Sequence, residues 1–366
     1  MKKVLFTVTN DLNYDQRMQR ICSTLQADGY DVTLIGRGSP ASSTLTQRTY
    51  GQKRIKCHFN SGPLFYVEYN VRLFFYLLFK RADAMCAVDL DTILPVYFAG
   101  IFRNSKRVYD AHEYFTEMKE VVTRPRIHRF WLRVERFAVP KFPQGYTVNT
   151  FIKNKLAELY KVNYAIVRNL PLYENIVPSN RISEKKIFIY QGAVNEGRGF
   201  ETLIPAMKSV NAELHIYGNG NYVNQVKQLI ADNGIENNVK LMGSVMPEQL
   251  KKITPEMYAG IMIVENCGLN LYNSLANKFF DFMMAGIPQI CIDFPEYRSI
   301  NDQYRFGYMV PDIESKTLSD AMTRLMQDKE LYKKLKTNSI AAREELNWQA
   351  ESKTLLAFYK SLLQHG

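Results

Sequence analysis

The chain has 366 residues, of which 46% are hydrophobic and 23% are charged, and its formal net charge at pH 7 is +11. This length suits two domains of ordinary size, and the composition is that of a globular protein rather than a disordered or fibrous one. Five widely spaced cysteines without a CxxC pair, and no apolar run of about 20 residues, exclude a disulfide framework, a cysteine zinc site and a membrane span, and favour a reduced, cytoplasmic protein.

The first half of the chain alternates between short apolar strands and amphipathic helices. The predicted elements are strands at 3–9, 31–35, 84–88, 107–110 and 145–149 and helices at 14–28 and 150–159. The opening apolar run is too short for a secretory signal peptide. His112 and Glu113 follow the strand at 107–110, where an imidazole could bind a sugar hydroxyl and Glu113 or Glu117 could act as a base. A purely structural role for the histidine stays open.

A basic stripe follows, on a segment with helical spacing. Its cations are Arg126, Arg129, Arg133 and Arg136, and an apolar stripe of Ile127, Phe130, Val134 and Phe137 runs beside them. This pattern suits an anionic membrane surface, although a solvated face above a core stripe gives the same spacing. The aromatic segment 63–79 could likewise be a core helix or an interfacial one. No nucleic-acid partner is expected, because the charge is not interleaved with an RNP-like, zinc-finger or helix-turn-helix pattern.

The second half repeats the alternation. Its predicted elements are strands at 187–191, 213–217, 239–242, 260–264, 289–292 and 308–310, helices at 200–208 and 222–232, and a last helix that begins at 348. Alternating β and α units predict a parallel sheet in each half. Ligands bind at the carboxyl ends of the strands in such sheets, and the polar residues of this chain gather there.

Two segments of the second half suit a phosphate. Residues 192–199, GAVNEGRG, lie between a strand and a helix, and Arg198 could clamp a phosphate there; a tight loop with a solvated arginine is the alternative. Residues 271–288, LYNSLANKFFDFMMAGIP, predict a polar loop and a buried helix on which Ser274, Lys278 and Asp281 share one face. Lys278 and the helix N-terminus suit a diphosphate, and Asp281 suits ribose hydroxyls. A structural Lys278–Asp281 ion pair is the competing interpretation.

These segments together resemble the family-four retaining glycosyltransferases, which have the GT-B fold. The resemblance extends over nearly the whole chain. It is carried, in chain order, by DQR (15–17), GYDVT (29–33), YDAHE (109–113), VRNLP (167–171), GAVNEGRG (192–199), IYGNG (216–220) and SLANKFFDFMMAGIP (274–288). The last helix resembles the one that returns to the first domain in this family.

The resemblance implies an α/β protein of the GT-B class, with two Rossmann-like domains whose parallel sheets face each other across a cleft. Residues 1–171, with a returning helix at 348–366, would bind the acceptor, and residues 172–347 would bind the nucleotide sugar. A UDP- or GDP-sugar is the expected donor, and a glycan or lipid-linked molecule is the expected acceptor. Transfer with retention, without a cofactor or a metal ion, is also implied.

Residue roles follow from the same resemblance. Arg198 takes the place of the family's phosphate lysine, Asp281 that of its ribose-binding glutamate and His112, with Glu113 beside it, that of its catalytic-site histidine. The expected donor-binding residues are Gly192, Arg198, Gly199, Gly218, Asn273, Ser274, Leu275, Ala276, Asn277, Lys278 and Asp281. The expected acceptor-side residues are Asp11, Asp15, Arg17 and Asp89.

Three departures from the family pattern concern the donor site. Ala193 stands where many members have a phosphate-binding arginine, a loss that Lys278 could cover. Asn273 stands where the E-x7-E pattern has its first glutamate, and Asp281 is one methylene shorter than the second. Backbone N–H groups at 274–276 could take over part of the contact with the donor sugar.

The sequence therefore predicts a cytoplasmic, metal-independent glycosyltransferase of surface polysaccharide or glycoconjugate assembly. Its basic stripe would hold it at the inner face of a membrane. Two alternatives remain open: a nucleotide-sugar-binding protein without catalytic activity, and a sugar-nucleotide epimerase of the same architecture. Analysis of products separates the epimerase from the transferase, because an epimerase lacks a dedicated acceptor site.

Overall fold

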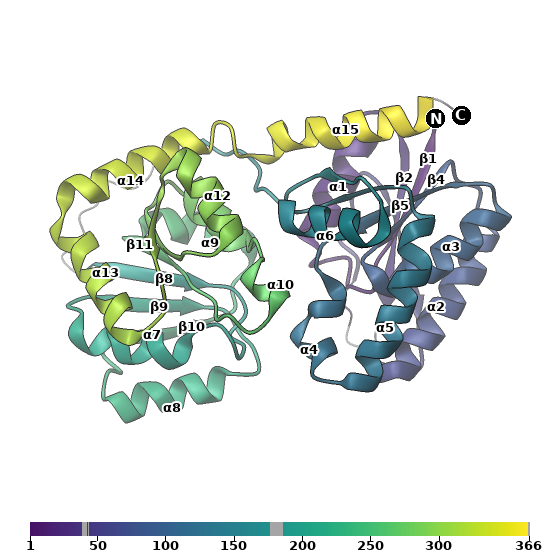
Figure 1. Cartoon of the computed structure of the whole chain (residues 1–366). Coiled ribbons are helices and arrows are strands. Elements are labelled where there is room, and N and C mark those ends of the chain that lie inside the picture. The colour runs from purple at the N-terminus through teal and green to yellow at the C-terminus, as the bar shows by residue number, and fades with distance from the viewer. Residues whose placement is uncertain (39–41, 43, 176–185, 365–366) are drawn as a thin grey trace. The chain divides into compact units, whose positions relative to one another are not determined.

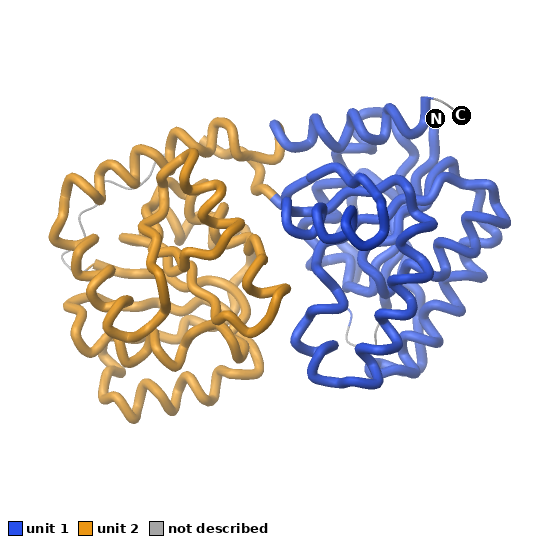
Figure 2. Tube along the Cα trace, in the orientation of Figure 1, with its two compact units in different colours: residues 1–169, 350–366 blue, residues 170–349 orange. Residues whose placement is uncertain are grey.

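The computed structural model of the chain describes residues 1–38, 42, 44–175 and 186–364. The chain forms two compact units, shown in Figure 2: unit 1 comprises Met1–Asn169 and Ala350–Gly366, and unit 2 comprises Leu170–Gln349. The boundaries expected from the sequence followed residues 171 and 347, close to these junctions. Residues 365 and 366 of the expected last helix lie outside the described residues.

Unit 1 is a parallel sheet with helices, in the strand order β3-β2-β1-β4-β5-β6-β7 (Figure 1). Its strands are β1 (Lys3–Thr7), β2 (Asp31–Gly38), β3 (Gly51–Lys56), β4 (Ala84–Val88), β5 (Lys106–Ala111), β6 (Gln144–Thr147) and β7 (Ala165–Ile166). Its helices are α1 (Gln16–Ala27), α2 (Gly62–Leu78), α3 (Ile93–Phe102), α4 (Lys119–Val122), α5 (Pro125–Ala138), α6 (Thr150–Tyr160) and most of α15 (Trp348–Gln364). All the strand pairs are parallel, as predicted.

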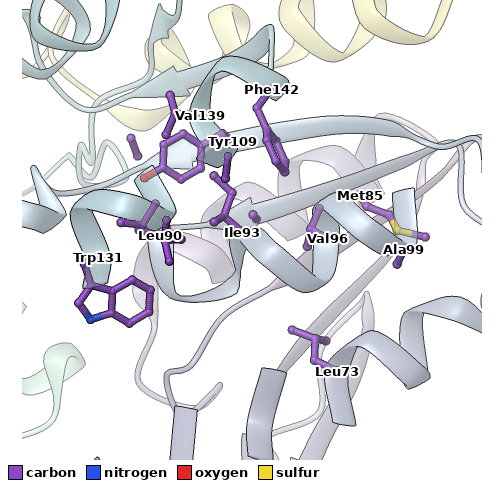
Figure 3. Close-up of a cluster of buried hydrophobic side chains, with 14 of the residues drawn as sticks. Leu73, Met85, Leu90, Ile93, Val96, Ala99, Tyr109, Trp131, Val139 and Phe142 are labelled. Atoms are coloured by element: carbon purple, nitrogen blue, oxygen red, sulfur yellow. The ribbon is translucent and has the colours of Figure 1, made fainter. Parts of the chain in front are cut away.

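The core of unit 1 explains which residues form these elements. Strand β4, AMCAV, is buried along its whole length, as expected for a parallel sheet covered on both faces. Figure 3 shows the side chains of α3 and their neighbours packed together in one cluster. Helix α2 buries one face, formed by Phe65, Tyr69, Leu73 and Leu77. The segment 63–79 is therefore a core helix on this face, but its opposite face is also apolar and is exposed.

Unit 2 has a second parallel sheet, in the order β10-β9-β8-β11-β12-β13. Its strands are β8 (Ile187–Gln191), β9 (Glu213–Tyr217), β10 (Val239–Gly243), β11 (Ala259–Met262), β12 (Gln289–Ile292) and β13 (Gly307–Val310). Its helices are α7 (Phe200–Ala206), α8 (Val223–Asn233), α9 (Pro247–Ile253), α10 (Leu269–Tyr272), α11 (Asn277–Met284), α12 (Pro295–Tyr304), α13 (Ser315–Gln327) and α14 (Lys329–Ala342). The parallel sheet predicted for the second half is confirmed.

The strand order locates a binding edge in each unit. In unit 2 the chain builds β8, β9 and β10 outward in one direction and then returns to add β11 on the other side of β8. In unit 1 the same reversal falls between β1 and β4. Ligands of open α/β sheets bind beyond the carboxyl ends of the strands at such reversals. The loops that follow β8 and β11, and those that follow β1 and β4, are therefore the places to search for a site.

Candidate functional site

Glycines shape the edge of unit 2 where β8 and β9 end. Gly192, directly after β8, has a φ of +123°, and its N–H donates to the Tyr217 carbonyl over 2.9 Å. A Cβ atom on Gly218 would lie 1.8 Å from the Gly192 carbonyl oxygen, so only glycine fits there. The two loops consequently pack backbone against backbone, which brings residues 192–199 close to the end of the sheet.

Lys278 lies in the first turn of α11 and is only 9% exposed. Its Nζ atom has no hydrogen-bond partner among the residues that the structure describes, and it lies 3.8 Å from the centroid of the Tyr190 ring. Burial, and next the positive charge of Arg198, hold the pKa of Lys278 well below its usual value. A buried amine without a partner is costly unless an anion arrives. The competing Lys278–Asp281 ion pair is not formed.

Arg198 is the second cation of this site. Its side chain is half-buried in the loop before α7, and it forms no hydrogen bond or ion pair within the described part of the chain. The positive charge of Arg198 lowers the pKa of Lys278, and it also opposes the rise that burial causes in the pKa of Tyr190. Arg198 therefore lies close to both residues. Two basic side chains this close together, with no carboxylate of the described residues bound to either, suit a polyvalent anion.

Asp281 lies one turn further along α11. Its Oδ2 atom accepts from Gln191 Nε2 over 3.2 Å, and Gln191 Oε1 in turn accepts from the Thr254 hydroxyl over 2.9 Å. Asp281 is half-buried, so this chain of contacts fixes the carboxylate without enclosing it. Gln191 and Thr254 were not predicted, because Gln191 meets Asp281, and Thr254 meets Gln191, only when the sheet has folded. The arrangement suits recognition of hydroxyl groups next to a diphosphate.

The loop before α11 differs from the prediction. Helix α11 begins at Asn277, and Ser274 lies in the preceding turn, so the prediction that Ser274 shares a helix face with Lys278 and Asp281 is wrong. The reason is that Ala276 is extended, with φ −70° and ψ 141°, and separates α10 from α11. The buried Tyr297 hydroxyl accepts from the Ala276 N–H over 3.0 Å and lies 3.2 Å from Ser274 Oγ. That N–H, expected to face the donor sugar, is therefore already bonded.

The other predicted donor residues surround this loop. Asn273 is buried and its side chain donates to the Leu269 carbonyl over 2.9 Å. Leu275 is half-buried, and Asn277 is exposed at the start of α11. The Gly199 N–H donates to Glu265 Oε1 over 3.2 Å, so a carboxylate that the sequence did not single out holds the end of the loop 192–199.

His112 follows β5 in unit 1 and lies in a buried polar network. Its Nε2 atom is 2.6 Å from Arg17 Nε and 2.9 Å from Asp110 Oδ2, and Arg17 Nη2 donates to Asp110 Oδ1 over 2.9 Å. Burial opposes a charged imidazole, but the Asp110 carboxylate outweighs it and raises the pKa of His112. Arg17 is 4% exposed and also donates to the Val167 carbonyl. Arg17, which was expected on the acceptor side, is thus a buried residue that fixes the position of the His112 ring.

Two carboxylates lie where β4 ends, at the reversal of the sheet. Asp89 has a φ of +56°, and its Oδ1 atom accepts the His112 N–H over 2.8 Å. Asp91, which was not predicted, accepts from the Thr9 hydroxyl over 2.5 Å. Burial raises the pKa of Asp89 to about 7 and that of Asp91 to about 6. Both carboxyls can therefore hold a proton near neutral pH, whereas Glu113 is exposed beside them.

The remaining residues that were predicted for the acceptor side, Asp11 and Asp15, organise the loop after β1. Asp15 caps α1 by accepting the Met18 N–H over 3.0 Å. Asp11 accepts from the Ser42 hydroxyl and from Arg54 Nη2, each over 2.7 Å. In the part of the chain that the structure describes, no cluster of three or more His, Cys, Asp or Glu is arranged to hold a metal ion.

The predicted basic stripe lies on α5. Arg126, Arg129, Arg133 and Arg136 are all exposed. Of the apolar stripe beside them, Val134 is buried and Ile127 packs against the core, whereas Phe130 and Phe137 are 54% and 42% exposed. Half of that stripe therefore belongs to the core and half faces solvent. None of the described helices is both long enough and apolar enough to cross a membrane.

Comparisons with known proteins place the fold of the chain among known folds. The family model described as "Glycosyl transferases group 1" matches residues 173–342. Sucrose-phosphate synthase from Thermosynechococcus elongatus has a similar structure, with a TM-score of 0.84, 14% identity and 100% coverage of both chains. HepE from Anabaena in complex with UDP and glucose has a TM-score of 0.79 and 12% identity over 99% of this chain and 100% of the other.

A glycosyltransferase from Rickettsia africae ESF-5 is also similar, with a TM-score of 0.78, 14% identity and coverage of 100% of this chain and 99% of the other. No curated protein matches the sequence. At these identities the likeness concerns the fold. Residues 173–342 thus match the group 1 glycosyl transferase model, and the whole chain has the two-domain GT-B fold.

Proposed function

We propose that the protein is a glycosyltransferase that moves a sugar from a nucleotide-sugar donor to a glycan or lipid-linked acceptor, with retention and without a metal ion. The observation that carries this proposal is the pair of basic side chains Lys278 and Arg198, to which no carboxylate binds among the residues that the structure describes. Asp281 lies on the same helix as Lys278 and suits the ribose of a nucleotide. Assembly of a surface polysaccharide or another glycoconjugate would be the setting.

The donor is proposed to be a UDP-sugar first and a GDP-sugar second. Support for uridine comes from the similar structures, since HepE was solved with UDP-glucose and a TarM variant from S. aureus with UDP. Support for a glycan or lipid acceptor comes from WaaG, a glycosyltransferase involved in lipopolysaccharide biosynthesis. The donor would be held by unit 2 and the acceptor by unit 1, where His112, Asp89 and Asp91 gather.

The chemistry follows from charge development. As the glycosidic bond to the donor breaks, negative charge grows on the departing diphosphate, and Lys278 and Arg198 are already in place to stabilise it. Lys278 gains most from this step, because it is buried where water cannot screen the interaction. His112 and Asp89 are proposed to contact hydroxyl groups of the reacting sugars.

A thermal-shift panel tests the donor assignment. UDP, GDP, ADP, TDP and CMP, each with its sugar conjugates, are added to the intact chain, and a ligand that binds only the folded state raises the melting temperature. We expect the largest rise with UDP and its sugars. Chromatographic analysis of products, with EDTA present, then separates transfer from epimerisation and from binding alone. A panel without any shift would remove the donor site.

A nucleotide-sugar-binding protein without activity remains the second candidate. The observation that favours it is the Tyr297 hydroxyl, which occupies the Ala276 N–H that was expected to help hold the donor sugar. Asn273 also stands in place of a family glutamate. Donor binding without any transferred product, across a range of glycan and lipid-linked acceptors, would favour this candidate.

The ribose contact gives a prediction for Asp281. Wild type should prefer a nucleoside diphosphate over its 2′,3′-dideoxy analogue by about 10- to 150-fold, the range expected for hydrogen bonds to a charged group, whereas Asp281→Asn should show little preference. Isothermal titration gives the affinities. Asp320→Asn, an exposed carboxylate on α13, is the matched control and should keep the full preference. Equal binding of both nucleotides by wild type would assign Asp281 another task.

The basic stripe gives a prediction for the proposed membrane association of unit 1. Each surface Lys or Arg contributes about 1 kcal/mol to binding an anionic bilayer, and salt screens the effect. Arg129→Glu with Arg133→Glu should therefore abolish co-sedimentation with anionic vesicles at low salt. The control with equal charge change is Lys333→Glu with Lys334→Glu on α14, both exposed in unit 2. If wild type does not sediment with anionic vesicles at low salt, the stripe is an ordinary solvated face.

A further inference from the structure

A second cationic site lies in unit 1, at the opposite edge of the sheet from His112. Lys3 opens β1, Asp83 precedes β4, Arg81 follows α2 and Arg103 follows α3, and the four residues meet at the amino ends of the strands. Together with Ala82 they line an open hollow of about 380 Å³. Because the proposed acceptor contacts lie at the carboxyl ends, this hollow is separate from them.

Some of the charged side chains in the hollow have partners among the described residues and others do not. Asp83 is satisfied, since its carboxylate accepts the Lys3 N–H over 2.7 Å and lies 3.3 Å from Lys2 Nζ. Lys3 Nζ lies 3.1 Å from Asp31. Arg81 and Arg103 have no hydrogen bond or ion pair within the described part of the chain, and the Arg103 Nε atom is buried without a partner. Two guanidinium groups thus remain for an anion, and their planar fork matches a phosphate.

The surface beside the hollow is apolar and exposed. Phe79, two residues before Arg81, is 79% exposed, and Phe102, directly before Arg103, is 68% exposed. The same surface continues along the outer face of α2 through Leu64, Val67, Val71 and Phe75. More than half of the exposed large hydrophobic side chains in the described residues lie on α2, α3 and α5 or at their ends. A patch of this kind marks an interaction site.

Contacts between aromatic rings show that this surface is continuous with the apolar stripe on α5. The Phe74 and Phe102 rings lie 6.3 Å apart and join α2 to α3. The Phe98 and Phe137 rings lie 6.5 Å apart and join α3 to α5. Figure 1 shows the three helices on the same side of unit 1. On these helices the carboxylates are Glu68, which is bonded to Arg72, and Glu135, which is buried, so the exposed charges are positive.

We propose that Arg81 and Arg103 bind the phosphate of an anionic phospholipid, and that Phe79 and Phe102 enter the acyl boundary beside it. A surface that binds at a membrane interface needs cations for the lipid headgroups and, next to them, aromatic rings for the hydrocarbon region. A soluble phosphate would use the same cations but would leave the aromatic rings in water. A lipid therefore fits both halves of the surface. This inference rests on the membrane association proposed for unit 1 and does not depend on the donor.

Brominated lipids give a local test. Phe79→Trp and Phe102→Trp are prepared separately in the intact chain and mixed at low salt with phosphatidylglycerol vesicles that carry bromine near the acyl boundary. The fluorescence of each variant should be quenched well beyond that of wild type, whose Trp131 and Trp348 are buried. Phe59→Trp, an exposed position before α2, is the control for an aromatic residue outside these helix ends. Binding without quenching at 79 and 102 would overturn the proposal.

Charge variants test the hollow itself. Arg81→Glu should weaken vesicle binding by about 25-fold, because two units of charge change and each contributes about fivefold. Lys333→Glu changes the charge equally on α14 and should have little effect. Circular dichroism melts verify that both variants fold, independently of any nucleotide. Equal effects of the two variants would overturn the proposal. A second result would also overturn the proposal: the protein does not bind vesicles, but glycerol 3-phosphate raises its melting temperature and Arg103→Gln abolishes this rise.

Discussion

Lys278→Met is expected to weaken donor binding and to stabilise the free protein. Without the ammonium group, affinity for the best nucleotide sugar should fall by about 10- to 150-fold, the range for a hydrogen bond to a charged group. The melting temperature without ligand should rise, because an amine that is buried without a partner is replaced by an apolar chain of similar shape. Titration calorimetry and thermal melts measure the two effects.

The control for this result is Lys227→Met, which removes an exposed lysine from α8. Neither affinity nor melting temperature should change in it. Opposite signs of the two effects in Lys278→Met identify a residue whose cost to folding is offset by a ligand. A variant that loses both stability and affinity would show instead that Lys278 supports the core through the Tyr190 ring.

The affinity for a nucleotide sugar should also fall as pH rises. Burial and the charge of Arg198 hold the pKa of Lys278 well below that of an ordinary lysine, whereas a bound diphosphate favours the ammonium form and raises this pKa. Between the free and bound pKa values the complex holds one proton more than the free protein. Binding therefore takes up a proton in this window, and affinity falls by up to about tenfold per pH unit.

Titration calorimetry in two buffers of different ionisation enthalpy, at one pH, counts this proton. A nucleotide sugar is a better probe than a nucleoside diphosphate, because its diphosphate lacks the terminal ionisation that would add a proton of its own. Lys278→Met should abolish the uptake. The stability of the free protein changes with pH in the opposite direction. The unfolded chain holds a proton on Lys278 that the folded chain lacks, so the contribution of this site to stability increases as pH rises from the folded to the unfolded pKa. A donor affinity independent of pH would contradict the proposed role.

Periodicity predicted those parts of the fold that are decided locally. The buried strands β4, β8 and β12 and the helix α11 are evident because most of their residues are apolar. Strand β3 was not predicted, since GQKRIK is mostly polar and forms a strand only by pairing with β2 at the edge of the sheet. A pattern within one segment cannot report a partner that lies elsewhere in the chain.

In the candidate site, too, the sequence predicted the local features but not the contacts between distant segments. The pattern of 271–288 predicted that Lys278 is buried, because its neighbours on α11 are apolar. The partners of the site could not be predicted, because each contact joins residues that lie far apart in the chain: Gln191 with Asp281, Tyr297 with Ala276 and Arg17 with His112. The extended Ala276, which removed Ser274 from the helix, has no signal in residue type alone.

The path of the chain has a consequence for how the protein is made. Tyr359 of α15 is fully buried in unit 1, where its ring packs on Phe6 and its hydroxyl lies 3.4 Å from that of Tyr146. Unit 1 thus needs a segment that the ribosome synthesises only after all of unit 2. During synthesis, residues 1–169 lack the Tyr359 side chain that packs in the core of unit 1, whereas Leu170–Gln349 is one continuous segment that can complete its own core. The order of folding is therefore expected to reverse the order of synthesis, and a nascent chain stalled before α15 would be the species that chaperones bind.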